Sequence, residues 1–366
     1  MKVALVYDRV NKWGGAERVL LALHEMFPDA PLYAAVYSPK NAQWAKVFPE
    51  IHTSFLQKIP FLNTRHELLG TFMPIAFETF DFSGFDLVIS VTSEAAKGII
   101  TKPPTKHICI CLTPTRYLWS GYDYYFRNPV LRFFSRPAVR YLRKWDKMAA
   151  QRPDKIVAIS GAVKERIDKY YGRESEIIYP PVDANKFQIA SSKSQTNHNL
   201  QNHEYYLLVS RLVPYKRVDL AIEVFNELKT PLVVVGRGSQ AWELKLKAKK
   251  NIKFVGAVGE EELAGYYKNA KALVMPQEED FGIVAVETQA AGAPVIAYAK
   301  GGASDTVVSG KTGVLFKTQN KESLKNAIKK FEKMNFDKEE IRKNAQRFSN
   351  ENFRKELKKV INGIVK

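Results

Sequence analysis

Short runs of apolar, often β-branched residues recur along the chain, and segments with a helical apolar period lie between them. The runs fall at 2–8, 30–37, 86–93, 106–113 and 155–160, and then at 205–212, 231–238, 252–258, 271–277 and 294–300. Strands that alternate with helices in this way predict parallel sheets buried by helices on both faces. The pattern therefore predicts an α/β chain with two doubly wound domains. Ligands in such folds bind beyond the carboxyl ends of the strands.

A polar stretch separates the two sets of runs. Residues 188–204 hold almost no large apolar side chain and follow neither a helical nor a strand period, which is typical of a surface loop or linker. With 366 residues, the chain is also longer than a single hydrophobic core usually serves. We expect a first domain at 1–184 and a second at 185–349, followed by a helix at 350–366 with an apolar stripe.

The composition is that of an ordinary globular protein, with 45% hydrophobic and 26% charged residues. No stretch approaches about eighteen consecutive apolar residues, so neither a membrane span nor a signal peptide is expected. Cys109 and Cys111 share one face of a predicted strand and are poorly placed to bridge each other, which fits a reduced, cytoplasmic setting. The net charge of +18 favours nucleic acid, an anionic bilayer or a phosphorylated substrate as partner.

The segment 276–292, PQEEDFGIVAVETQAAG, follows a predicted strand and opens a helix. If the helix begins near Gly282, Glu279 lies in the preceding loop and Glu287 about one turn inside the helix. The helix amino end offers backbone N–H groups and a positive dipole to a phosphate, while a carboxylate accepts hydrogen bonds from sugar or ribose hydroxyls. The alternative is that the acidic residues only stabilise the first turn.

The segment 210–217, SRLVPYKR, carries Arg211, Lys216 and Arg217 at the end of another predicted strand. Cations at this position can neutralise the charge of a bound diphosphate as a glycosidic bond breaks. Solvated loop cations are the alternative.

The segment 13–18, WGGAER, follows the first predicted strand. Gly14 and Gly15 let the backbone approach a ligand closely at the amino end of a helix. The dinucleotide fingerprint G-x-G-x-x-G is absent here, and a tight turn without a ligand is the alternative.

Together these three segments resemble the retaining glycosyltransferases of family 4, which have the two-domain GT-B architecture. The resemblance covers nearly the whole chain, from WGGAER through SRLVPYKR, EEDFGIVAVE and YAKGGASDTV to the terminal RFSNENF. It implies two Rossmann-like domains with a cleft between them, of which the first binds the acceptor and the second the nucleotide sugar. The final helix would pack back on the first domain.

The resemblance also implies roles for single residues. Arg211 and Lys216 would bind the donor diphosphate, Glu287 the ribose, and Glu279 with backbone amides the transferred sugar; Glu279, Arg211 and Lys216 are the expected catalytic residues. Gly15 would close over the donor from the first domain, and the loop at 254–259 would hold the nucleobase through its backbone. The full set of expected donor contacts is Gly14, Gly15, Arg211, Lys216, Val258, Glu279, Phe281, Gly282, Ile283 and Glu287.

Within this family the chain is similar to bacterial enzymes that build cell-surface polysaccharides, often with GDP-mannose as donor. The residues that carry this similarity are 111–119, CLTPTRYLW. Relatives usually have a histidine at the position of Leu112, so a sugar-binding contact is expected to differ here. A second hypothesis follows, namely a sugar-nucleotide-binding protein without catalysis or with altered specificity.

No two aspartates are spaced as Asp-x-Asp, and the six histidines form no ligand-spaced pair. We therefore expect neither a metal nor another cofactor. The family retains the sugar's configuration without an obvious enzymic nucleophile, which implies that the leaving diphosphate helps to deprotonate the acceptor on the same face.

Basic and aromatic residues alternate over 116–152, where nine Lys or Arg and two Asp give a local net charge of +7. Such a mixture suits an anionic membrane surface, and Arg132, Arg136 and Arg140 are the expected membrane or acceptor contacts. A helix at 128–150 with an ordinary solvated basic face is one alternative, and single-stranded nucleic acid stacked on the rings is another.

The expected function is transfer of a hexose to a lipid-linked or polysaccharide acceptor at the inner face of the cytoplasmic membrane. Nucleic-acid binding is supported only by the charge, and the sequence contains no known nucleic-acid motif.

Overall fold

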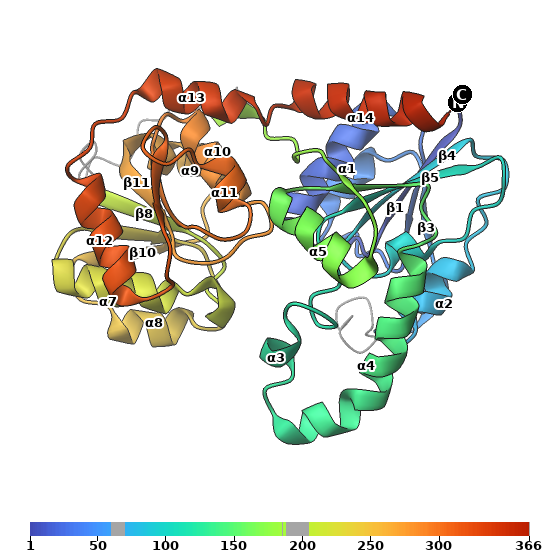
Figure 1. Ribbon diagram of the computed structural model, residues 1–366, viewed down its shortest axis with the longest axis horizontal. Helices are drawn as coiled ribbons and strands as arrows, with labels where there is room; N and C mark the ends of the chain where they lie inside the picture. Colours follow the sequence, from blue (N-terminus) through green and yellow to red (C-terminus); the bar gives the residue numbers. More distant parts are fainter. Residues whose placement is uncertain (60–69, 185, 188–204, 366) are drawn as a thin grey trace. The chain divides into compact units, whose positions relative to one another are not determined.

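The computed structural model describes residues 1–59, 70–184, 186–187 and 205–365 (Figure 1). The predicted linker at 188–204 lies outside these residues. The chain divides into two compact units, the first formed by Met1–Pro181 with Phe353–Lys366 and the second by Val182–Asn352. Each unit contains one parallel sheet with helices around it, so the predicted class of two doubly wound α/β domains is confirmed.

Among the described residues, the sheet of the first unit has seven parallel strands in the order β3-β2-β1-β4-β5-β6-β7. They are β1 (Val3–Tyr7), β2 (Leu32–Ala34), β3 (Ile51–Thr53), β4 (Leu87–Thr92), β5 (Lys106–Cys111), β6 (Lys155–Ala158) and β7 (Glu176–Ile177). The α-helices are α1 (Gly15–Met26), α2 (Met73–Glu78), α3 (Tyr122–Tyr125), α4 (Pro129–Ala149), α5 (Gly161–Tyr171) and α14 (Asn350–Ile364). The strand order reverses between β1 and β4, which makes a topological switch point beside the loop after β1.

The described sheet of the second unit has six parallel strands in the order β10-β9-β8-β11-β12-β13. They are β8 (Tyr205–Val209), β9 (Leu232–Val235), β10 (Ile252–Gly256), β11 (Ala270–Met275), β12 (Val295–Tyr298) and β13 (Gly313–Phe316). The α-helices are α7 (Val218–Leu228), α8 (Ala241–Lys247), α9 (Glu260–Asn269), α10 (Ile283–Ala290), α11 (Ala303–Thr306), α12 (Lys321–Phe331) and α13 (Lys338–Gln346). Here the switch point lies between β8 and β11.

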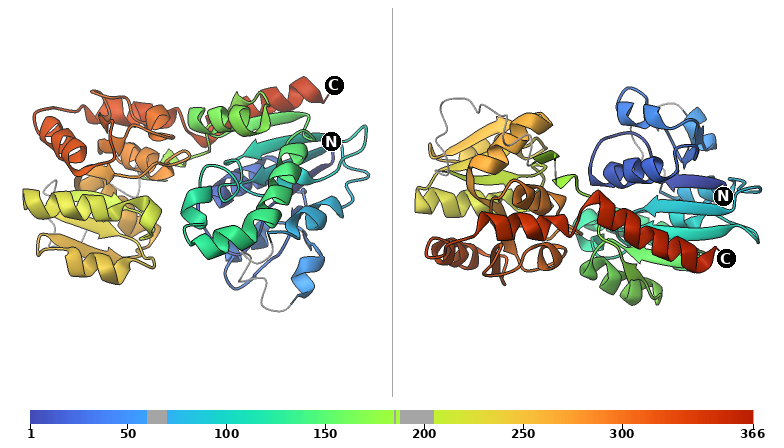
Figure 2. Two further views of the ribbon diagram at one scale, coloured as in Figure 1. Left: turned by 60° about the horizontal axis from the view of Figure 1, so that its bottom comes forward. Right: turned by 90° about the horizontal axis from the view of Figure 1, so that it is seen from above.

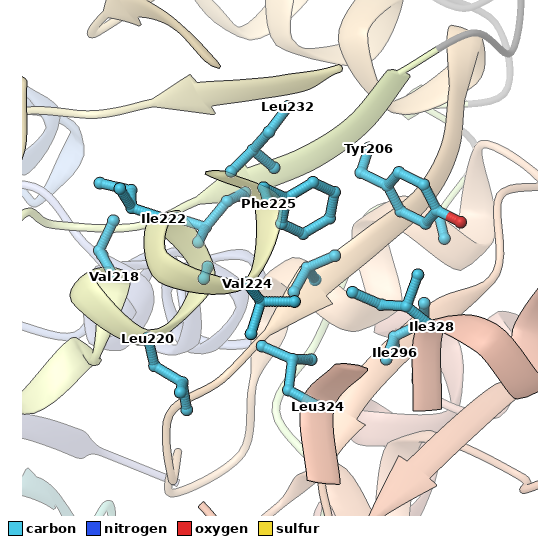
Figure 3. Packing of buried hydrophobic residues seen from close by; sticks show 14 of the residues in the cluster. Tyr206, Val218, Leu220, Ile222, Val224, Phe225, Leu232, Ile296, Leu324 and Ile328 are labelled. Atoms are coloured by element: carbon cyan, nitrogen blue, oxygen red, sulfur yellow. The ribbon is translucent and has the colours of Figure 1, made fainter. Parts of the chain in front are cut away.

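The core of the second unit includes a layer where α7 and α12 pack on one face of the sheet (Figure 3). Phe225 of α7 lies against Tyr206 of β8, with 5.1 Å between the ring centroids. Leu324 and Ile328 lie one turn apart on α12, and both are buried. This packing buries one side of β8, so the loop that follows this strand starts from the core of the unit.

The last helix, α14, belongs from Phe353 onward to the first unit (Figure 2). Phe353, Leu357 and Val360 of α14 are buried at helical spacing, so the predicted apolar stripe is confirmed. Arg354 of the same helix forms an ion pair with Glu25 of α1. None of the described helices is long and apolar enough to cross a bilayer.

Candidate functional site

The loops that follow β8 and β9 approach each other so closely that only glycine fits between them. A Cβ atom on Gly236 would lie 1.9 Å from the carbonyl oxygen of Ser210, and one on Gly238 would lie 2.2 Å from that of Leu212. The amide of Leu212 also donates to the carbonyl of Arg237 over 2.9 Å. The loop after β8 is therefore held in one conformation by its neighbour.

The loop between β11 and α10 is held in the same way by the loop after β12. A Cβ atom on Gly301 would lie 2.0 Å from the carbonyl oxygen of Glu279, and one on Gly302 would lie 2.2 Å from that of Phe281. The amide of Gly302 donates to the Glu279 carbonyl over 2.8 Å. These contacts fix the backbone on both sides of Asp280 at the switch point of the sheet.

The side chain of Glu279 is held by partners from two loops. Lys216, at the end of the short 3-10 helix Pro214–Lys216 after β8, forms an ion pair with it. Gln277 Nε2 donates to the same Glu279 oxygen over 2.9 Å. Lys216 and Gln277 are only 9% and 3% exposed, so the carboxylate sits on a rigid support at the carboxyl edge of the sheet.

Helix α10 begins directly after this loop. Gly282 precedes its first residue with φ at +86°, in the left-handed region that glycine adopts readily, and no side chain caps the helix. An amino end without a side-chain cap presents backbone N–H groups and the positive end of the helix dipole to an anion. The site therefore combines a cation, a fixed carboxylate and a helix amino end.

Glu287 lies inside α10, and its side chain is buried. The hydroxyl of Tyr267, on α9, donates to Glu287 Oε2 over 2.7 Å. This hydrogen bond fixes the carboxylate about one turn from the amino end of the helix.

Arg211 differs from Lys216 because it is exposed. Its guanidinium hydrogen-bonds the hydroxyl of Tyr215, four residues further along the same loop. The two cations thus lie on one loop, one buried against Glu279 and the other exposed beside Tyr215.

In the first unit, the loop after β1 leads into α1 through Gly14 and Gly15. No side chain caps α1 either. Behind the loop, the Tyr7 hydroxyl donates to Glu17 Oε1 over 2.8 Å, and both residues are buried. Burial and the neighbouring Glu17 carboxylate hold the pKa of Tyr7 well above its usual range, so this hydroxyl stays protonated and keeps donating.

Comparison with known proteins decides the family. A profile described as Glycosyltransferase Family 4 matches residues 13–186, and one described as Glycosyl transferases group 1 matches residues 191–348. Together the two matches cover both units almost entirely. The chain belongs to the family 4 glycosyltransferases.

The individual relatives of this chain are distant. An uncharacterized glycosyltransferase of Methanocaldococcus jannaschii is 28% identical over 57% of this chain and 58% of its own length. A GDP-mannose-dependent alpha-(1-6)-phosphatidylinositol monomannoside mannosyltransferase of Mycolicibacterium smegmatis is 28% identical over 48% of this chain and 52% of its own length. The chain thus spans about half the length of these curated relatives.

Solved structures confirm the GT-B fold over the full length of the chain. The Anabaena HepE protein in complex with UDP-glucose is similar with a TM-score of 0.72 and 19% identity, and the match covers 99% of this chain and all of HepE.

Within the second unit, the structure brings together Lys216, Glu279, the Phe281 and Gly282 backbone and the start of α10 at Ile283. The Phe281 side chain is buried against Phe348, with 5.5 Å between the ring centroids, so only its backbone is placed for a ligand. Val258 lies half-buried in the loop between β10 and α9. The roles of all these residues remain predictions.

Some residues that organise the site were not predicted. Gln277 stands in the quoted motif, but its contact with Glu279 depends on how the loop folds, and spacing alone does not reveal it. Gly301 and Gly302 were part of the resemblance without a role of their own. Two adjacent glycines directly after a predicted strand are the signal that indicates such a close approach.

The first unit carries the remaining predicted residues. Leu112 directly follows β5 and is half-buried, and its amide donates to the Thr92 carbonyl over 2.8 Å. Arg132, Arg136 and Arg140 lie exposed on α4, whose bounds agree with the helix predicted at 128–150. Across the described residues, no group of three or more His, Cys, Asp or Glu side chains is arranged to hold a metal ion.

Proposed function

We propose that this family 4 enzyme transfers a hexose from a nucleoside-diphosphate sugar to its acceptor with retention of configuration and without a metal. The observation that carries the proposal is the Lys216–Glu279 ion pair at the uncapped amino end of α10. The family assignment supports it, because both profiles that match the chain describe glycosyltransferases.

In the proposed mechanism the diphosphate lies against the amino end of α10 and is neutralised by Lys216 and Arg211. As the bond between the sugar and the diphosphate breaks, negative charge builds on the leaving oxygen, and the two cations and the helix dipole stabilise it. The leaving diphosphate then takes the proton of the attacking acceptor hydroxyl. No enzymic nucleophile and no metal ion is needed for this sequence of steps.

The two carboxylates bind different parts of the donor. Glu279 accepts hydrogen bonds from hydroxyls of the transferred sugar, together with the amides of Phe281 and Gly282. Glu287 accepts from the ribose hydroxyls, and the backbone near Val258 contacts the nucleobase. Release of Lys216 from Glu279 toward the diphosphate frees a Glu279 oxygen for the sugar, which couples phosphate binding to sugar binding.

For the acceptor we propose a lipid-linked glycan or a polysaccharide of the cell surface, reached at an anionic membrane. GDP-mannose is the first donor to test, because the mycobacterial relative is named as using it on a phosphatidylinositol mannoside. UDP-glucose is the second, because it is the ligand in the similar Anabaena structure.

The test is binding and turnover in variants of the phosphate-binding loop. Lys216→Ala and Arg211→Ala each remove a charge-assisted contact worth about 1.5–3 kcal/mol, so donor affinity measured by calorimetry should fall about 10- to 100-fold. Lys271→Ala is the matched control, since Lys271 also forms an ion pair in this unit, with Glu332, but at the start of β11. Unchanged affinity in both loop variants would contradict the proposal.

The second candidate, a binding protein without catalysis, is motivated by Leu112. It predicts tight binding of a nucleotide sugar but no release of the nucleoside diphosphate, with or without acceptor. Donor hydrolysis in the absence of acceptor would favour the enzyme.

A further inference from the structure

Helix α4 begins with two turns that are exposed all around their circumference. Residues 129–134 are all exposed, and four of them are large and apolar. Val130, Leu131, Phe133 and Phe134 expose 64%, 52%, 62% and 74% of their surface. We call these four side chains the apolar tip. In Figure 1 this end of α4 projects beyond the sheet and helices of the first unit.

The exposed apolar surface continues along the helix. Tyr141 and Met148 follow Val130 and Phe134 on one line of the helix, and both are about half exposed. A different face of α4, with Val139, Leu142 and Trp145, is buried in the unit. The outer apolar line is therefore additional to the face that the fold requires, and exposed apolar surface of this extent marks an interaction site.

The charges beside this line are almost all positive. Arg132, Arg136 and Arg140 follow one another at intervals of four residues, one helical turn apart, and all three are exposed. The chain has no acidic residue from 124 to 145 but six Arg or Lys. Asp123, just before this stretch, forms an ion pair with Arg132 over 3.0 Å.

We propose that the apolar tip inserts into the boundary between headgroups and acyl chains of an anionic bilayer, while the arginines beside it bind lipid headgroups. An apolar line with a basic row beside it fits a flat interface that is apolar below and anionic above. Aliphatic Val130 and Leu131 offer no ring for stacking on nucleic-acid bases. This inference rests on the membrane acceptor of the proposed function and adds the element that holds the enzyme there.

Two contributions to binding follow, and salt separates them. Attraction of the arginines to anionic lipid is screened as ionic strength rises, whereas burial of the apolar tip is not.

The test is co-sedimentation with phosphatidylcholine vesicles, with and without phosphatidylglycerol, at low and high salt. The double variant Phe133→Ser/Phe134→Ser should partition at least about tenfold more weakly at both salt concentrations, because two ring burials are lost. The triple variant Arg132→Glu/Arg136→Glu/Arg140→Glu should lose mainly the binding that low salt favours.

The second unit offers a matched control. Trp242 and Leu246 of α8 expose 74% and 65% of their surface beside lysines, much as the apolar tip does beside arginines. The variant Trp242→Ser/Leu246→Ser should bind vesicles like the original protein. A loss as large as that of the double phenylalanine variant would overturn the proposal, because it would mean that any exposed apolar pair binds lipid.

A depth measurement distinguishes insertion from adsorption. In Phe134→Trp, the added indole fluorescence should be quenched by lipids brominated on their acyl chains, relative to the original protein on the same vesicles. Absence of added quenching would overturn the proposal. So would a double phenylalanine variant that binds vesicles as well as the original protein but changes from dimer to monomer.

Donor affinity is measured on the same proteins, so that the two proposals can fail separately. If the original protein binds the donor but not the vesicles, only the membrane inference is wrong. If the original protein does not bind the donor, the proposed function is contradicted.

Discussion

Glu279 and Glu287 are separated by eight positions and lie in different surroundings. Glu279 accepts from Lys216 and Gln277 at the loop surface and is partly exposed, whereas Glu287 is buried and accepts from Tyr267. A carboxylate at the surface can exchange its partners for a ligand, while a buried one keeps its position and offers a fixed acceptor. This contrast agrees with the different roles proposed for them.

We predict that Glu279→Gln weakens binding of the sugar-bearing donor more than binding of the bare nucleoside diphosphate, because only the transferred sugar contacts Glu279. Glu287→Gln should weaken both ligands alike, by about tenfold, because both carry the ribose. Glutamine keeps an acceptor for Tyr267, so the buried hydrogen bond is retained. Calorimetric titration of both ligands into both variants provides the four affinities, and equal losses in all four would mean that the roles are misassigned.

Leu112 allows a prediction about donor choice. Leu112 directly follows β5, and its isobutyl group cannot form a hydrogen bond, whereas an imidazole at that position can hydrogen-bond a sugar hydroxyl. A site that hydrogen-bonds a hydroxyl rejects the deoxy analogue strongly, but an apolar site discriminates by only about 1–3 kcal/mol per methylene. Leu112→His should therefore shift the ratio of kcat/KM toward the fully hydroxylated hexose over its deoxy counterpart. An unchanged ratio in two folded, active proteins would show that residue 112 does not contact the sugar.

At the scale of elements, the helices and strands carry the loops, and glycines fit the loops together. Gly302 has an ordinary φ of −66°, so its constraint is close approach rather than backbone strain. In Gly302→Ala the added carbon would collide with the Phe281 carbonyl, and the loop that holds Glu279 must shift. We expect donor affinity to fall about tenfold or more and stability to fall by about 1–3 kcal/mol.

Gly363→Ala is the control for that prediction, because a Cβ atom there meets nothing within 4 Å and the residue lies in α14. Alanine also favours a helix by about 1 kcal/mol over glycine. Donor affinity in this variant should match the original protein. If Gly302→Ala also binds the donor normally, the close approach of the two loops does not position the site.

The strands illustrate what could be predicted from the sequence. All ten apolar runs form strands, because a strand buried on both faces needs continuous apolar residues. Among the described residues three strands were missed, β3, β7 and β13, and each lies at an edge of its sheet. Residues of β3 and β7 are only partly buried or exposed, so their side chains carry little apolar signal, and their pairing depends on the neighbouring strand.

The same distinction holds for the candidate site. The motif around Glu279 and Glu287 was readable because a helix start combines local signals, namely a glycine and the apolar period that follows it. The support from Gln277 and from Gly301 and Gly302 depends on contacts between loops that follow different parts of the chain. Such contacts are set by strand order, which single-sequence patterns do not specify.

At the scale of the whole molecule, one buried histidine of the first unit predicts how stability depends on acid. His107 lies in β5 near the centre of the first sheet, is fully buried, and has its Nε2 atom 2.8 Å from Ser90 Oγ. Burial lowers its pKa from 6.5 to about 3, with Arg152 adding to the decrease and Asp154 opposing it. The folded first unit therefore keeps this imidazole neutral at pH values where the unfolded chain protonates it.

The direction of the pH effect follows from proton binding. Between pH 6.5 and about 3 the unfolded state binds a proton at His107 that the folded state does not, so stability falls as the pH falls through this window. One such group contributes a slope of at most about 1.4 kcal/mol per pH unit, and its contribution is fully present above pH 6.5. A leucine side chain at position 107 cannot be protonated. The stability of His107→Leu, measured by urea unfolding, should therefore depend less steeply on pH between 7 and 5, even if its stability at pH 7 is lower.

Tyrosine and tryptophan fluorescence would mix the transitions of the two units. The unfolding midpoint of the first unit is therefore best measured by protease cleavage of the whole protein at each urea concentration, followed through the peptides that contain β5. Peptides that contain β11 report the second unit as the internal reference. If the β5 midpoint of the variant keeps the pH slope of the original protein, other buried groups determine the acid sensitivity of the first unit.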